Sequence, residues 1–141
     1  MVSLSIYQSH LDNIPKQYQF LKLLRPPIYL IELSNNKVTA VCYYKDGSSK
    51  RHQINAGFSN RRMVIADFLL AVQAITDLLL KFPKYPFGIS SFAIVNVTEE
   101  LVDGLTMIEI KAIREAVWAA SGQAKRRTIS ITISYQGQVV S

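Results

Sequence analysis

Cysteine and histidine, the residues that most often form disulfides or metal sites, are scarce in this sequence. Cys42 is the single cysteine, so no disulfide can form within the chain, and its place in a predicted strand favours packing in a reducing compartment over chemistry. His10 and His52 are isolated, with no cysteine or carboxylate at the spacing of a metal site. The serines lack the G-x-S-x-G setting of a hydrolase nucleophile. We therefore expect neither a metal centre nor a catalytic residue.

Long hydrophobic runs are also missing. No apolar stretch reaches the roughly 18 residues of a membrane-spanning helix, and the first residues lack the basic and apolar regions of a signal peptide. Of the 141 residues, 49% are hydrophobic and 18% charged, which indicates a folded chain rather than a disordered one. We expect a cytoplasmic protein, with the inner face of the membrane as an alternative location.

Positive charge exceeds negative charge, and the formal net charge is +6. The basic residues gather at Lys50–His52, Arg61–Arg62 and Lys125–Arg127. Such clusters either attract phosphates and anionic lipid or are ordinary solvated charge at loops and helix ends. The second interpretation is the commoner one.

The strongest structural signal is a hairpin near the start of the chain. Ile28–Leu33 is rich in apolar and β-branched residues, and Val38–Tyr44 is again strand-like. Ser34–Asn36 between them has turn chemistry, because asparagine tolerates a positive φ. A hairpin this apolar belongs in the middle of a sheet. Glu32 breaks the pattern with a carboxylate inside the first strand, where it faces either solvent or a site.

Further strands and helices follow in a regular order. Apolar spacings of three and four predict a helix over Val64–Phe82. A second helix, Met107–Ala120, begins after Thr106, with Glu109 at capping-box spacing. This order and the right-handed crossover rule predict an α/β, ribonuclease H-like fold with a mixed five-stranded sheet, the layout of half an actin-type ATPase. The other predicted segments are strands at Ser49–Ile54, Ile89–Val97 and Thr128–Tyr135, a loose tail at Gln138–Ser141, and a single domain over residues 28–141.

The first 27 residues are predicted to be an arm and a short helix. Met1–Asn13 has little periodicity and is expected to be extended or partly ordered. Pro15 suits a first helical position, and Lys16–Arg25 is short, amphipathic and basic. This segment either packs on its own domain or contacts a membrane or a partner. The contact residues would be Phe20, Leu21, Lys22, Leu24 and Arg25.

Three stretches stand in the order and spacing of a known family. They are Ile31–Val38 (IELSNNKV), Met63–Phe68 (MVIADF) and Glu109–Ala116 (EIKAIREA). They resemble, respectively, the first phosphate loop I-D-L-G-T-A-N-T, the helix start G-V-I-A-D-F and the helix E-R-R-A-V-R-E-S of the MreB family of bacterial rod-shape actins. Phe20–Arg25 is similar to the basic amphipathic segment with which many members begin. The resemblance covers residues 20–123 and implies an actin-like fold, in a family that polymerises, sits on the membrane and recruits cell-wall enzymes.

Departures from the family pattern imply that ATP hydrolysis is lost. The second phosphate loop, D-I-G-G-G-T, and the adenosine pocket have no counterpart among these residues, and the last strand carries Ser and Thr where the family has its water-positioning carboxylate. In the first loop a glutamate replaces Asp and a serine replaces Gly, and the added Cβ obstructs a close phosphate. Phosphoryl transfer needs both loops, a metal carboxylate and a positioned water. We therefore expect no cofactor and a degenerate phosphate loop formed by Glu32, Ser34, Asn35, Asn36 and Lys37.

The function expected from this resemblance is a non-catalytic module that acts through protein contacts. It would bind a protein partner or associate with itself in a cell-shape or envelope-associated assembly, with peripheral membrane contact as a further option. Binding to nucleic acid is not expected.

Two other functions are compatible with the residues. A ribonuclease H-like nuclease would use Glu32, with Asp67 and Glu115 as conceivable partners around two metal ions. Against it, the predicted fourth strand offers no carboxylate, Asp67 suits a helix N-terminus, and Glu32 could pair with the Lys50–Arg51 cluster. A nucleotide-binding remnant would instead hold ATP at Asn35–Lys37 without hydrolysing it.

Overall fold

The structure is a computed structural model that describes residues 2–12, 16–18, 23, 25–60, 62–84, 91–99, 101 and 104–141. Its elements are α1 (Val2–Asp12), η1 (Lys16–Tyr18), β1 (Ile28–Ser34), β2 (Lys37–Tyr43), β3 (Ser49–Asn55), α3 (Phe68–Leu80), β4 (Ser91–Val97), α4 (Met107–Gln123), β5 (Thr128–Tyr135) and β6 (Gln138–Val139).

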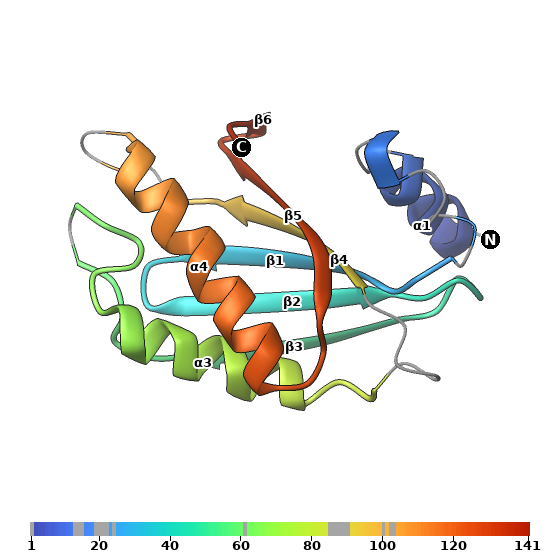
Figure 1. Ribbon diagram of the computed structural model, residues 1–141, viewed down its shortest axis with the longest axis horizontal. Helices are drawn as coiled ribbons and strands as arrows, with labels where there is room; N and C mark the ends of the chain where they lie inside the picture. The colour runs from blue at the N-terminus through green and yellow to red at the C-terminus, as the bar shows by residue number, and fades with distance from the viewer. Residues whose placement is uncertain are drawn as a thin grey trace.

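A mixed sheet in the order β3-β2-β1-β4-β5-β6 runs through the molecule (Figure 1). β1 lies inside it, antiparallel to β2 and parallel to β4, and β4 is parallel to β5. The predicted α/β fold is confirmed, and the predicted hairpin holds the predicted place within the sheet. The polar strand β3 forms one edge.

The described residues form a sheet of six strands where five were predicted, because the tail is not loose. Gln136 and Gly137 both have positive φ, 50° and 82°, and turn the chain back on itself. Val139 then pairs with Ser134, and Gln138 with Tyr135, to form β6. The prediction of an unpaired tail was wrong, since the turn chemistry of Gln136–Gly137 makes a hairpin.

Helices α3 and α4 cover one face of the sheet and pack on each other (Figure 1). Tyr29, Ile31 and Leu33 alternate along β1 toward these helices and are at most 3% exposed. Because each helix leads back into a parallel strand, both helices begin at the end of the sheet where β1 and β4 finish. The turn between β1 and β2 lies at this same end.

The boundaries of the two helices differ from those predicted. α3 begins after Asp67 rather than at Val64, because Asp67 caps it by accepting the Leu70 N–H at 3.1 Å. α4 continues past Ala120 to Gln123, since Ser121 is buried and its hydroxyl bonds the Trp118 carbonyl within the helix at 2.9 Å. The predicted start of β4 at Ile89 lies outside the described residues, and β5 matches its prediction.

The opposite face of the sheet is covered at one end by α1. Tyr7 and Leu11, one helical turn apart, are buried against Ile28 of β1 and Phe92 of β4. The Tyr7 hydroxyl also donates to the Pro26 carbonyl at 2.7 Å. The prediction of an extended arm was wrong. The segment is helical, and its side chains Tyr7 and Leu11 pack on the sheet.

The basic segment after α1 is described only in part. Lys16–Tyr18 forms a single 3₁₀ turn, Leu23 is 77% exposed, and the Arg25 guanidinium lies 5.5 Å from the centre of the Tyr7 ring. The other four predicted contact residues, Phe20, Leu21, Lys22 and Leu24, lie outside the described residues. No helix in the part of the chain that the structure describes is long and apolar enough to cross a bilayer.

Candidate functional site

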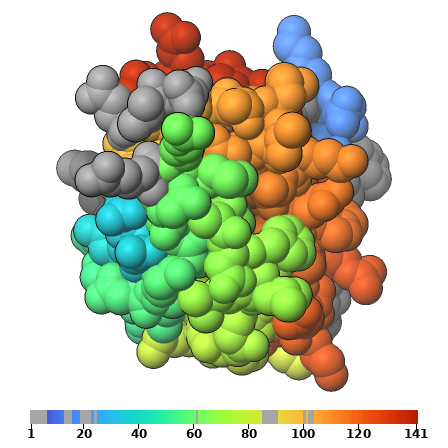
Figure 2. Space-filling model, turned by 90° about the vertical axis from the view of Figure 1, so that its left-hand side faces the viewer, coloured from blue at the N-terminus to red at the C-terminus, as the bar shows by residue number. Residues whose placement is uncertain are grey.

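The turn between β1 and β2 carries the residues predicted to form a degenerate phosphate loop. Figure 2 looks onto this end of the molecule, where the turn, in cyan, lies beside the green residues that lead into α3. Ser34 closes β1 and pairs with Lys37, which opens β2. Asn35 and Asn36 form the turn itself. The structure therefore brings Ser34–Lys37 together as predicted, with Glu32 further back in the strand.

Asn36 fastens this turn to the segment before α3. Its φ of 55° is left-handed, a conformation that asparagine tolerates better than most residues. Its N–H donates to the Ser59 hydroxyl at 3.0 Å, and its side-chain carbonyl accepts the Ser59 N–H at 2.8 Å. The Ser59 hydroxyl in turn donates to the Val64 carbonyl at 2.5 Å. The N–H of Asn36 is thus satisfied from within the chain.

The second N–H of the turn is also satisfied from within. Asn35 donates its N–H to a carboxylate oxygen of Glu99, just beyond β4, at 3.0 Å. A phosphate bound at this turn would need the same N–H group, because backbone N–H groups are what such loops offer an anion. A negatively charged side chain already stands in that position.

Glu32 lies on the face of the sheet away from α3 and α4. Its neighbours Ile31 and Leu33 point into the helix-covered core, and alternation turns Glu32 to the other side, where it is half-buried. Its register partners are Thr39 on β2 and Asn96 on β4. The described residues offer Glu32 neither an ion pair nor a second carboxylate on these neighbouring strands.

The carboxylates that a nuclease would need do not gather around Glu32. Asp67 caps α3, and Glu115 lies on α4 with its side chain 4.0 Å from Lys111, so both belong to the helix side of the sheet. No group of three or more metal-binding side chains occurs in the described part of the chain. The suggested pairing of Glu32 with Lys50–Arg51 was wrong, because the register places Gln53 of β3 opposite Thr39 and hence in line with Glu32.

Among the described residues at this end of the molecule, Glu109 is a buried carboxylate. It is 3% exposed and accepts the Val64 N–H at 3.1 Å, while Thr106 accepts the Glu109 N–H at 3.2 Å, as the capping spacing predicted. Burial raises the pKa of Glu109, and hydrogen bonds from the Val64 and Thr106 N–H groups act against that rise. Glu109 joins the start of α4 to the segment before α3, so its role is structural.

The single cysteine and the two histidines pack against other side chains. Cys42 is fully buried, and burial raises the pKa of its thiol to about 12, which leaves it unreactive at neutral pH. The His10 ring lies 4.9 Å from that of Tyr43, and burial lowers the pKa of His10. The His52 ring lies edge-on to Phe82 at 4.8 Å. The packing role predicted for Cys42 fits these contacts.

One basic cluster holds two helix ends together, and another is exposed on the surface. In Lys125–Arg127, the middle residue donates from Nε and Nη2 to the Phe82 carbonyl at 3.2 and 2.6 Å, which holds the end of α3 to the end of α4. Lys50 and Arg51 are exposed on the edge strand β3.

Ser59 and Glu99 are the site residues that the sequence did not reveal. They reach the turn across 23 and 64 residues of sequence. Neither stands in a motif, although the serine and asparagine run at 59–60 is turn chemistry.

No protein-family model and no curated protein matches this sequence. Among solved structures, the chain is similar to the ethanolamine utilization protein EutJ from Carboxydothermus hydrogenoformans, at 11% identity and a TM-score of 0.50, over 82% of this chain and 50% of EutJ. This chain has an actin-like fold. It spans half the length of the EutJ chain, as the predicted half-domain would. The actin-like part of the resemblance is confirmed, and the narrower relation to MreB stays a prediction.

Proposed function

We propose that this chain is a non-catalytic actin-like module that acts through protein–protein contacts. The observation that carries the proposal is the closed turn between β1 and β2. Its two N–H groups, on Asn35 and Asn36, already bond Glu99 and Ser59.

A phosphate would bind this turn at a net cost. It would have to displace two internal acceptors, Glu99 at an exposed hydrogen bond and Ser59 at a partly buried one, and each bond contributes about 1 kcal/mol. It would also approach the negative charge of Glu99, a repulsion that solvent weakens because this bond is exposed. No residue of the turn other than Lys37 brings a compensating positive charge. These terms disfavour a nucleotide-binding role.

The narrower assignment is a MreB-like role in a cell-shape or envelope-associated assembly in the cytoplasm, with the inner face of the membrane as the alternative location. The stretches similar to MreB support it by their placement: Ile31–Val38 forms the turn, Met63–Phe68 leads into α3, and Glu109–Ala116 opens α4. All three adjoin the same end of the molecule. The partner would be another protein or a second copy of the chain.

Calorimetry with magnesium and ATP tests the loss of nucleotide binding. We expect no binding heat from the full chain at millimolar ATP, and a saturable heat would refute the proposal. Glu99→Gln is the matched variant, since it keeps an acceptor for the Asn35 N–H but removes the charge. Capture of partners from the native cell extract, read beside the size of the purified protein, tests the contact role.

A further inference from the structure

The edge of β5 that faces away from β4 is only partly paired. β6 covers Ser134 and Tyr135, and the next residues of the tail fold over Ile133. The N–H groups of Val140 and Ser141 both donate to the Ile133 carbonyl, at 2.8 and 3.2 Å, and the Ile133 N–H donates to the Ser141 carbonyl at 3.0 Å. Two residues therefore oppose one, which is the arrangement of a β-bulge and ends the ladder.

Beyond this bulge, the described part of the chain supplies no strand to the edge of β5. Ile131 stands two residues before Ile133, so its N–H and C=O point to the same outer side. An arginine takes the place of the missing strand: Nη1 of Arg114, on α4, donates to the Ile131 carbonyl at 2.7 Å, and Nη2 bonds the Ser141 hydroxyl. Among the described residues, Arg114 has no carboxylate as an ion-pair partner.

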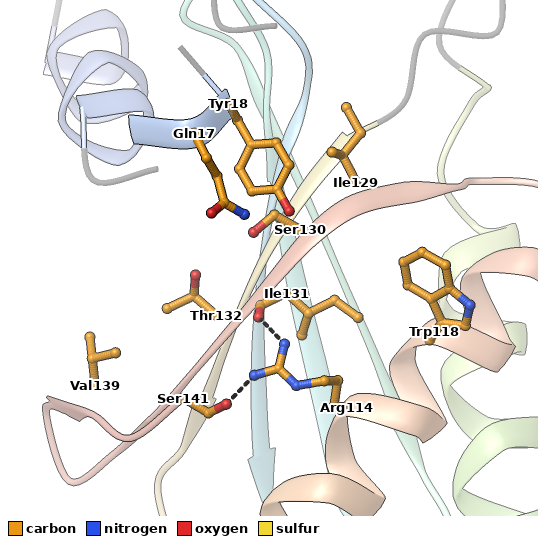
Figure 3. Close-up of a pocket in the computed structure, with 10 residues that line it drawn as sticks. All are labelled: Gln17, Tyr18, Arg114, Trp118, Ile129, Ser130, Ile131, Thr132, Val139 and Ser141. Atoms are coloured by element: carbon orange, nitrogen blue, oxygen red, sulfur yellow. Dashed lines mark hydrogen bonds between the residues drawn. The ribbon is translucent and has the colours of Figure 1, made fainter. Parts of the chain in front are cut away.

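A cavity of about 490 Å³ lies along this unpaired edge (Figure 3). α4 contributes Arg114 and Trp118 to one side, and η1 contributes Gln17 and Tyr18 to the other, with β5 running between them. Trp118 is 56% exposed, although a tryptophan carries a large apolar surface. Trp, Tyr and Arg are the residues most enriched at the centres of protein interfaces.

We propose that this edge accepts an extended segment of a partner protein, which adds a strand antiparallel to β5 where β6 leaves off. Its main chain replaces the Arg114 guanidinium at the Ile131 carbonyl, and the released guanidinium pairs with an acidic side chain of the segment. A bulky apolar side chain two residues later packs on Trp118. The inference rests on the proposed contact function and gives it a surface. Main-chain bonds to an open sheet edge supply affinity in such complexes, and alternate side chains supply specificity.

The spacing of the two side chains fixes the order of this motif. Arg114 and Trp118 stand four residues apart on α4, about 6 Å along the helix axis, and alternate residues of a strand are about 7 Å apart on one face. α4 runs antiparallel to β4 and β5. A strand antiparallel to β5 therefore runs in the same direction as α4. The acid therefore precedes the apolar residue, as acid-x-apolar.

Charge complementarity favours this occupant over others. The chain carries a formal charge of +6, and the cavity contains an arginine that bonds two neutral oxygens, the Ile131 carbonyl and the Ser141 hydroxyl. An acidic strand gains both an ion pair in a partly covered site and hydrogen bonds to the open edge.

The test uses fluorescence anisotropy with the full chain and acetylated octapeptides in a threonine- and valine-rich host. One set carries Glu-x-Phe at its centre and the matched set carries Lys-x-Phe. We expect saturable binding of the Glu set, at least tenfold weaker binding to Arg114→Glu and to Trp118→Ala, and recovery of Arg114→Glu binding by the Lys set. N-methylation of every second peptide residue should abolish binding when the blocked N–H groups face β5, and should spare binding when they face away from it.

Lys111→Gln is the control variant, because it removes a charge from the same helix at a side chain 78% exposed, without placing a carboxylate one turn from Arg114. Its affinity should stay within about twofold of that of the wild type, since charges well exposed to solvent interact weakly. Urea unfolding of each variant verifies that it is folded, and Trp118→Ala serves independently of Arg114.

Equal binding of the two peptide sets, or binding insensitive to both substitutions, would overturn the inference. So would a dimer that Arg114→Glu dissolves, since the occupant would then be a second copy. If Arg114→Glu and Trp118→Ala still capture the native partners in full, this surface fails while the contact function stands. Failure of the wild-type chain to capture any partner or to associate with itself would instead defeat the contact function.

Discussion

Removing the side chain of Asn36 should loosen the closed turn by a measurable amount. The substitutions are Asn36→Gly and Asn36→Ala. Both lose the hydrogen bond from the Ser59 N–H to the Asn36 side chain, 2.8 Å long and partly buried, and a bond of this kind contributes about 1 kcal/mol. Glycine accepts the φ of 55° freely, whereas alanine adds about 1 kcal/mol for a left-handed backbone. We therefore expect losses of about 1 kcal/mol for Gly and about 2 kcal/mol for Ala.

The assay is urea unfolding followed by far-UV circular dichroism. An unchanged slope of the transition verifies that the substitution has not altered the unfolded state. Ser59→Ala is the companion variant, because it removes the hydroxyl that accepts the Asn36 N–H and donates to the Val64 carbonyl. It should also lose about 1 kcal/mol. An Asn36→Ala variant no less stable than the Gly variant, or a Ser59→Ala variant as stable as the wild type, would show that Asn36 and Ser59 do not hold the turn together.

Three further outcomes follow from buried groups. Because burial raises the pKa of Glu109 in the folded state, its contribution is complete below the ordinary pKa and is lost as pH rises through the raised value. As pH rises from below about 4, the ordinary carboxyl range, Glu109→Gln should therefore lose less stability than the wild type, as measured by urea midpoints. Cys42, with its pKa raised to about 12, should resist a thiol reagent at pH 8 in the folded protein and react fully in denaturant, so rapid native reaction would contradict its burial. Tyr7→Phe should cost about 1 kcal/mol through loss of the bond to the Pro26 carbonyl, and a change below a few tenths would mean that the hydroxyl finds equal partners in water.

The strands could be predicted because their signals are local. Asparagines mark the turn between β1 and β2, and strict alternation marks β5 within its observed bounds. The cap of α4 was also predictable, since Thr106 and Glu109 stand in one turn of helix. In each case neighbouring residues carry the whole pattern.

The parts that escaped prediction depend on distant residues. Tyr7 and Leu11 of α1 are buried on a surface that comes partly from Phe92, far along the chain. The closure of the turn by Ser59 and Glu99 likewise depends on segments brought together by the sheet, so the sequence alone identified the loop but not its occupied N–H groups. The cavity beside β5 arises from a bulge at the tail that had been expected to be loose.

The docking of α1 has a consequence for the order of events during synthesis. α1 leaves the ribosome well before β4, yet part of the surface on which it packs belongs to β4. Vectorial folding, in which early segments settle early, is therefore closed to this helix. Until Phe92 emerges, Tyr7 and Leu11 form an exposed apolar pair to which a chaperone could bind. α1 is therefore one of the last elements to dock on the sheet.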